Sequence, residues 1–185
     1  ATIEEASRIS LLHQTSLADC FAYTKAAREK GLIVPVVFMG YYNNFLQHGI
    51  DQAKGQAQAV DCDKVMEDSI TCGVDGFIIV DLPAEQADEF HVKCVKNDLS
   101  LIPIVAPTST AERMKKAAQI ADTFIYVVSV LGVTGARASV NSEVKDLVAG
   151  VRKATEGRGI SVCVGFGVST LEHVAEIASY ADGVV

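Results

Sequence analysis

The stretch that decides the fold is Gly76-Phe77-Ile78-Ile79-Val80-Asp81-Leu82-Pro83, a short apolar strand that ends in a turn. Its aromatic and β-branched residues are typical of a strand buried on both faces, as in parallel sheets. After the turn, the sequence predicts a helix over Ala84–Lys96 and a second apolar strand over Leu99–Val105. A strand, a helix and another strand form a βαβ unit, which implies a parallel sheet.

The same alternation continues on both sides of this unit. The predicted elements before it are helices over Thr2–His13 and Ser16–Lys30, a strand over Leu32–Met39 and a helical stretch over Asp51–Cys72. Those after it are helices over Ala111–Ala121, Ser142–Ala154 and Thr170–Ala181, alternating with strands over Thr123–Val130, Ile160–Val164 and Asp182–Val185. The chain is therefore expected to carry about five complete strands and the start of another.

The number of strands bears on the choice between two α/β architectures. An eight-stranded (β/α)8 barrel, or TIM barrel, needs about 250 residues, whereas this sequence has 185. An open doubly wound sheet would fit that length. The sequence starts with predicted helices and stops within a predicted strand, however, as part of a barrel would. We therefore expect an α/β fold, a TIM barrel incomplete as given, with residues 1–185 forming a single domain.

Composition and charge exclude several classes of protein. Lys+Arg number 16 against 23 Asp+Glu, and the net charge of -7 argues against nucleic-acid partners and a basic membrane-binding face. No apolar run approaches the roughly 18 residues of a membrane span, and the start Ala1–Glu5 does not resemble a signal peptide. The five scattered cysteines form no C-x-x-C pair, so we expect no disulfide framework or metal site and a cytoplasmic location.

Two glycine-containing segments follow predicted strands, where α/β proteins carry their working residues. They are Gly132-Val133-Thr134-Gly135-Ala136 and Gly165-Phe166-Gly167-Val168-Ser169. Ser169 and Glu172 have capping-box spacing, which predicts a helix start there. Backbone N–H groups at such a place can bind an anion, so the two loops together predict a phosphate subsite. The alternative, that each glycine only makes a tight turn, remains open.

The alternation of side chains along the strands predicts which residues face inward. Residues two apart share a face, which groups Ile78 with Val80, Ile102 with Ile104, Tyr126 with Val128, and Tyr41 with Met39. These apolar groups and two tyrosines could line a pocket for a flat aromatic ligand. Packing in a barrel core is the alternative.

Candidates for proton transfer and nucleophilic catalysis are few. Asp81 stands at a strand end, where it could be a general base or only a turn and cap residue. His13, His48, His91 and His173 fall on predicted helices or helix ends, and we expect all four to be solvated. Cys163 is expected to act as a small buried hydrophobic residue. There is no nucleophile-elbow motif to support a Ser-His-Asp triad.

Six segments together resemble the tryptophan synthase alpha chain family. They are Pro35–Asn43, Val74–Pro83, Ala106–Ser109, Tyr126–Ser129, Gly132–Ala136 and Val164–Ser169, in the family's order and spacing over nearly the whole chain. The combination of YVVS, GVTGA and a downstream GFG is the specific part of the resemblance.

The resemblance implies a barrel lyase of tryptophan biosynthesis that cleaves indole-3-glycerol phosphate to indole and glyceraldehyde 3-phosphate. Indole would pass to a pyridoxal-phosphate-dependent β partner, separate or fused, so no cofactor is expected on this chain. Substrate-binding residues carried over from the family are Ile3, Tyr41, Ile78, Val80, Ile104 and Tyr126 around indole, Gly135, Gly167 and Phe166 at the phosphate, and Thr134 in a loop that closes over the substrate.

Two departures from the family pattern qualify this expectation. The two carboxylates of the family's mechanism would lie upstream of Ala1, so residues 1–185 alone are expected to contain no catalytic residue and to be inactive. The region Asp51–Cys72 also looks roughly a dozen residues longer than usual. A non-catalytic, phosphate-binding relative that binds or regulates a β partner is the alternative. An epimerase or indole-glycerol-phosphate synthase is a third possibility, against which Gly132–Ala136 argues.

Overall fold

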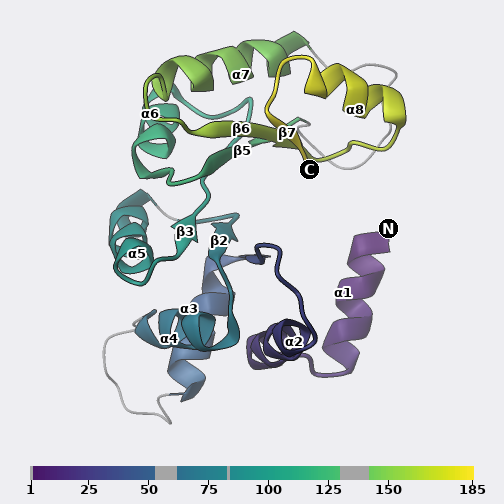
Figure 1. The fold of residues 1–185 in the computed structure, drawn as a ribbon, viewed down its shortest axis with the longest axis vertical. Coiled ribbons are helices and arrows are strands. Elements are labelled where there is room, and N and C mark those ends of the chain that lie inside the picture. The colour runs from purple at the N-terminus through teal and green to yellow at the C-terminus, as the bar shows by residue number, and fades with distance from the viewer. Residues whose placement is uncertain (1, 53–61, 83, 130–141) are drawn as a thin grey trace.

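The structure is a computed structural model that describes residues 2–52, 62–82, 84–129 and 142–185. The helices are α1 (Thr2–Leu12), α2 (Leu17–Glu29), α3 (Tyr42–Gln52), α4 (Asp63–Cys72), α5 (Ala84–Lys96), α6 (Ala111–Ile120), α7 (Ser142–Ala154) and α8 (Leu171–Ala178) (Figure 1). The strands are β1 (Val37–Gly40), β2 (Gly76–Ile79), β3 (Ser100–Leu101), β4 (Ile104–Val105), β5 (Phe124–Val128), β6 (Ser161–Gly165) and β7 (Gly183–Val184). Of the helices described, none is both long and apolar enough to cross a membrane.

All strand pairs are parallel, and they form two sheets ordered β1-β2-β3 and β4-β5-β6-β7. The single strand predicted over Leu99–Val105 is wrong in detail, because it divides at Ile102-Pro103 into β3 and β4. Proline has no N–H to donate to a ladder. Hydrogen bonds cross the break, however: Ile102 N–H donates to Phe77 O and Tyr126 N–H donates to Pro103 O. The strands thus run side by side in chain order, as expected of part of a barrel.

Helices α2 to α8 cover one face of the sheets, and two hydrophobic clusters lie beneath them. Phe77 and Leu101 belong to the first cluster, under α2 to α5, and are almost fully buried. Val127 and Val164 belong to the second, under α6 to α8, and have no exposed surface. Figure 1 shows α5 beside β3 and α7 alongside β6. The apolar strands therefore pack one face against helices, whereas the sequence predicted burial of both faces. On the other face Ile78 is only half-buried and Met39 is 57% exposed.

Helix starts differ from the predictions where the capping residue was misjudged. The helix predicted over Asp51–Cys72 is wrong, because α3 begins at Tyr42 and a separate α4 begins at Asp63. The capping box predicted at Ser169 and Glu172 is also wrong, since Thr170 is the N-cap of α8 and its side chain accepts from His173 N–H. A true capping box lies at the start of α2, where Ser16 and Asp19 accept each other's backbone N–H groups.

An aspartate clasp joins neighbouring strands at their amino ends. Asp75, just before β2, accepts the Val36 N–H at 2.6 Å and pairs with Arg28 of α2 at 2.6 Å. The same arrangement recurs with Asp122, the Leu101 N–H and His91 of α5, and with Asp182, the Val162 N–H and Arg152 of α7. Each aspartate accepts a backbone N–H and also pairs with a helix side chain, so this edge of the sheets serves stability.

Candidate active site at the carboxyl ends of the strands

The strand ends opposite the clasps bring the predicted site residues to one edge. Parallel strands place all their carboxyl ends on the same side. Val80 N–H donates to Gly40 O at 3.0 Å, which joins the ends of β1 and β2. Ser129 N–H donates to Gly165 O at 2.8 Å, which joins the ends of β5 and β6. Tyr41, Val80, Phe166 and Gly167 follow these ends directly in the chain.

The predicted inner face of the sheets agrees with the strand register. Ile104 of β4 is the register partner of Tyr126 on β5, and Ile78 of β2 is the partner of Met39 on β1. Burial leaves Tyr126 only 5% exposed and raises the pKa of its hydroxyl, so this group is a neutral donor at neutral pH. Ile104 and Ile78 are half-buried. These side chains therefore form an apolar floor behind the strand ends.

The residues at the edge itself are much more exposed than those of the floor. Tyr41 is 59% exposed, Phe166 50% and Val80 43%. These three side chains are therefore not packed in the core. Their exposure leaves them accessible to a ligand. Core packing, the alternative explanation for these apolar residues, applies only to Tyr126 and the half-buried isoleucines.

The turn after β6 has an unusual backbone that is held by β5. Phe166 has a φ of 76° and Gly167 a φ of 82°. A bulky residue in the left-handed region is an outlier that a surrounding contact must stabilise. The Ser129 hydroxyl donates to the Phe166 carbonyl oxygen. Ser129 was not among the predicted site residues, although a hydroxyl residue directly after the apolar strand Tyr126–Val128 was a signal for it.

Asp81 takes the capping role rather than that of an unpaired base. Its Oδ1 accepts the backbone N–H of Tyr42, the first residue of α3, at 2.7 Å. An acceptor at a helix N-terminus satisfies a donor that the helix itself cannot. Asp81 thereby fixes the turn that carries Tyr41. This capping contact accounts for an aspartate at the end of the strand.

The whole chain matches a known family. The family model described as tryptophan synthase alpha chain covers residues 1–185. The chain belongs to the tryptophan synthase alpha chain family. Among curated relatives of this family, the tryptophan synthase alpha chain of Roseiflexus castenholzii is 39% identical over 185 residues, which are 100% of this chain and 65% of that protein. The tryptophan synthase of Saccharomyces cerevisiae is 40% identical over 184 residues, and the match covers 24% of its length.

Solved structures that are similar to this chain show the same fold. The tryptophan synthase a2b2 complex from Pyrococcus furiosus contains a chain with a TM-score of 0.81 and 30% identity, matched over 100% of this chain and 68% of that one. An Aquifex aeolicus VF5 structure has a TM-score of 0.80 and 34% identity over 100% of this chain. This chain thus spans about two thirds of the length of the Roseiflexus castenholzii and Pyrococcus furiosus relatives, and its α/β fold is the partial TIM barrel that the strand count predicted.

Three of the predicted family site residues are not placed by side chain. Thr134 and Gly135 lie outside the described residues, and Ile3 lies in α1 with its side chain outside the described part. The other seven, Tyr41, Ile78, Val80, Ile104, Tyr126, Phe166 and Gly167, lie on strands or directly after them. Their roles toward a substrate stay predictions.

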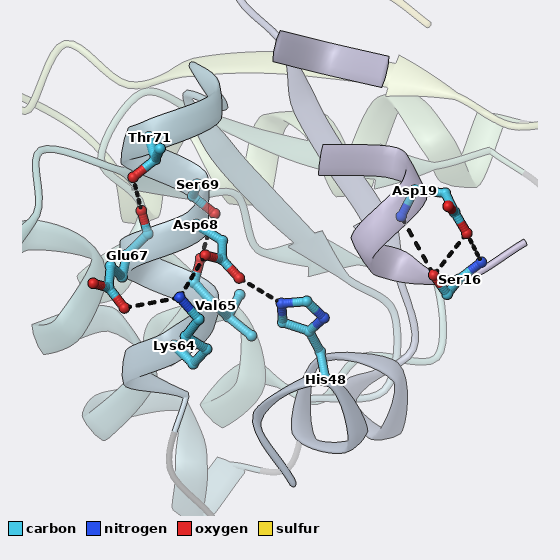
Figure 2. Close-up of polar contacts among 9 residues, drawn as sticks. All are labelled: Ser16, Asp19, His48, Lys64, Val65, Glu67, Asp68, Ser69 and Thr71. Atoms are coloured by element: carbon cyan, nitrogen blue, oxygen red, sulfur yellow. Dashed lines mark hydrogen bonds and ion pairs between the residues drawn. The ribbon is translucent and has the colours of Figure 1, made fainter. Parts of the chain in front are cut away.

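The prediction that all four histidines are solvated is wrong for His48. His48 of α3 is 5% exposed, with Nε2 at 2.7 Å from Asp68 Oδ2 and its ring 5.2 Å from that of Phe21. The His48–Asp68 contact therefore joins α3 to α4, and Lys64 of α4 pairs with the other oxygen of Asp68 at 2.8 Å (Figure 2). Burial raises the pKa of Asp68, but hydrogen bonds from Lys64 and His48 outweigh it and hold that pKa below its ordinary value. His91, which contacts Asp122, and His173 are half-buried, and His13 is exposed.

The cysteines provide no activated thiol. All five are free, and burial raises the pKa of each, to about 11 for Cys62, where Glu89 adds to the effect. A raised pKa keeps the thiol protonated and unreactive at neutral pH. Cys163, expected to be buried, is half-buried on β6. Among the described residues, no group of three His, Cys, Asp or Glu side chains could hold a metal ion.

Proposed function

We propose that the complete protein containing these residues is the tryptophan synthase alpha chain type of lyase, which cleaves indole-3-glycerol phosphate to indole and glyceraldehyde 3-phosphate. The observation that carries the proposal is the family match over residues 1–185. The gathering of apolar and glycine residues at one strand edge supports it, because an indole ring needs an apolar floor and a phosphate needs free backbone N–H groups.

Each group of residues has a proposed part in substrate binding. Ile3, Tyr41, Ile78, Val80, Ile104 and Tyr126 surround the indole ring, while Gly135 and Gly167 donate backbone N–H groups to the phosphate beside Phe166. Thr134 lies in a loop that closes over the substrate and excludes water. The exposed edge residues and the buried Tyr126 have positions that fit these parts.

The acid–base chemistry is proposed to come from outside residues 1–185. Cleavage breaks the bond between indole C3 and the glycerol side chain, delivers a proton to C3 and removes one from a glycerol hydroxyl, which positioned carboxylates can do. Asp81, the carboxylate at the described strand edge that was a candidate base, is held by Tyr42 N–H. We therefore infer that residues 1–185 bind substrate and that upstream carboxylates catalyse.

The proposed partner is a β subunit or a fused β domain, which would carry the pyridoxal phosphate. The relative from Pyrococcus furiosus was solved as an a2b2 complex, which supports a separate β subunit. The yeast relative is much longer than this chain, which supports a fused arrangement. The five free cysteines support a reducing, cytoplasmic location.

The lyase assay on the complete natural protein tests this proposal. We expect indole release from indole-3-glycerol phosphate by the complete protein and none by residues 1–185 alone. Binding without cleavage by the complete protein would favour the non-catalytic alternative. Turnover by residues 1–185 at the rate of the complete protein would show that the catalytic carboxylates lie within them.

A matched pair of variants tests the site itself. Phe166→Ala removes a half-exposed ring at the proposed pocket, whereas Leu171→Ala removes a 78% exposed side chain on α8. Neither change should alter the melting temperature much, because neither side chain is packed. We expect KM to rise roughly tenfold for the Phe166 variant, the effect of losing about 1.4 kcal/mol of binding, and to stay unchanged for the Leu171 variant. Equal effects of both would contradict the assigned site.

A further inference from the structure

Ser129, which directly follows β5, holds the peptide between Phe166 and Gly167 by hydrogen bonding. Ser129 makes two contacts with the turn: its N–H donates to the Gly165 carbonyl at 2.8 Å, and its hydroxyl donates to the Phe166 carbonyl. The first contact continues the ladder, whose final register pair is Val128 and Gly165. The second lies beyond the ladder and is made by a side chain, so the ladder alone would not produce it.

Because the peptide group is planar, the contact at the Phe166 carbonyl also determines the orientation of the Gly167 N–H. In a trans peptide, the carbonyl oxygen of one residue and the N–H of the next point in opposite directions from the same rigid plane. No cis peptide is present among the described residues. The hydroxyl that turns Phe166 O toward β5 therefore turns the Gly167 N–H away from β5. The orientation of this N–H is set by Ser129.

The backbone conformation of Phe166 is unfavourable without a contact such as the one from Ser129. Phe166 at φ 76° is in the left-handed region, which is unfavourable for a residue with a side chain. Gly167 follows at φ 82°, where glycine has no such penalty. Tyr126 of β5 packs against the residue before this turn, because a Cβ placed on Gly165 would lie 2.7 Å from its ring. The turn is thus contacted by Ser129 and flanked by Tyr126.

We propose that Ser129 is a positioning residue, which orients the Gly167 N–H for the substrate's phosphate by holding the Phe166 carbonyl. This assignment rests on the proposed function, in which Gly167 donates to that phosphate. Ser129 itself touches no reacting atom. It acts through the peptide plane, so its loss should weaken phosphate binding without altering the acid–base step.

The test compares Ser129→Ala with Ser129→Thr in the complete protein. The alanine variant loses the hydroxyl, whereas the threonine variant keeps it. We expect alanine to raise KM for indole-3-glycerol phosphate roughly tenfold, and to weaken competitive inhibition by inorganic phosphate by the same factor, as for one positioned hydrogen bond. We expect kcat to change less than about threefold, indole binding to stay unchanged and threonine to restore KM.

Two outcomes would overturn the assignment while leaving the proposed function intact. One is a wild-type KM in an active Ser129→Ala variant. The other is a parallel loss of kcat, indole binding and melting temperature that threonine does not restore, because that pattern belongs to a structural role. If the wild-type complete protein neither binds nor cleaves indole-3-glycerol phosphate, the proposed function fails first and the assignment fails with it.

Discussion

Gly76 shows how tightly a single position is constrained where two strands meet. A Cβ placed on this residue would lie 2.4 Å from the backbone carbonyl oxygen of Ser100 on β3. A backbone atom in a ladder cannot move aside as a flexible side chain can. We expect Gly76→Ala to lower the free energy of unfolding by about 2–3 kcal/mol, the upper part of the range for overpacking, as measured by urea denaturation.

Gly150 provides the matched control for this variant. It lies within α7, and the nearest atom to an added Cβ is Met114 Sδ at 3.9 Å, an ordinary contact. Gly150→Ala should therefore raise stability by about 0.5–1 kcal/mol, because alanine is the better helix former. If both substitutions destabilised the protein equally, the steric explanation for Gly76 would be wrong.

At the scale of elements, the clasp at Asp182 makes strand pairing sensitive to acid. The Val162 N–H, opposed by slight burial and helped by Arg152, holds the pKa of Asp182 below its usual 3.8. A lowered folded-state pKa stabilises the fold above the unfolded-state value, and this contribution disappears as the pH falls through the folded-state value. We expect Asp182→Ala to cost about 1 kcal/mol at pH 7 and less at pH 3, as measured by denaturant unfolding.

Asp182→Asn separates charge from hydrogen bonding in this clasp. Its amide oxygen can still accept from Val162 N–H, but it carries no charge for Arg152. The asparagine variant should lose less stability than the alanine variant at pH 7 and approach the wild type at pH 3. A gap between wild type and variants that widens in acid would contradict the assigned sign.

Elements defined by local sequence were predicted well. The bounds of α5 and α7 agree with the prediction because their apolar periodicity and flanking turn residues are local signals. The start of α3 was missed because its cap is Asp81, which lies 39 residues further along the chain. His48 was misjudged for the same reason, since its partner Asp68 comes from another helix.

In the candidate site, too, features encoded locally were predictable and those that depend on distant residues were not. The inward face was predictable because Ile104 and Tyr126 follow the two-residue period of a strand, and their register agrees with it. The contact between Ser129 and Phe166 joins residues 37 apart. It depends on a backbone turn that no local pattern encodes, so only the structure could show it.

For the whole molecule, we expect the two hydrophobic clusters beneath the two sheets to open independently. Val65 belongs to the first cluster and Val127 to the second, and neither has exposed surface. Each valine-to-alanine change should cost about 2 kcal/mol locally. By hydrogen exchange on the complete protein, we expect Val127→Ala to speed exchange mainly in β5 and β6, and Val65→Ala mainly in β2. Uniform acceleration throughout both sheets by either variant would show a single cooperative core.

The three aspartate clasps enclose segments of different length. Two of them join residues 20 and 21 apart in the chain, whereas the clasp between Val36 and Asp75 spans 39. The longer one is no looser, with a distance of 2.6 Å. Doubling an enclosed loop costs only about 0.6 kcal/mol of closure entropy. We therefore expect insertions between the clasped residues to cost little stability. The clasps fix the strand register, and with it the site at the opposite edge, from outside the inserted segment.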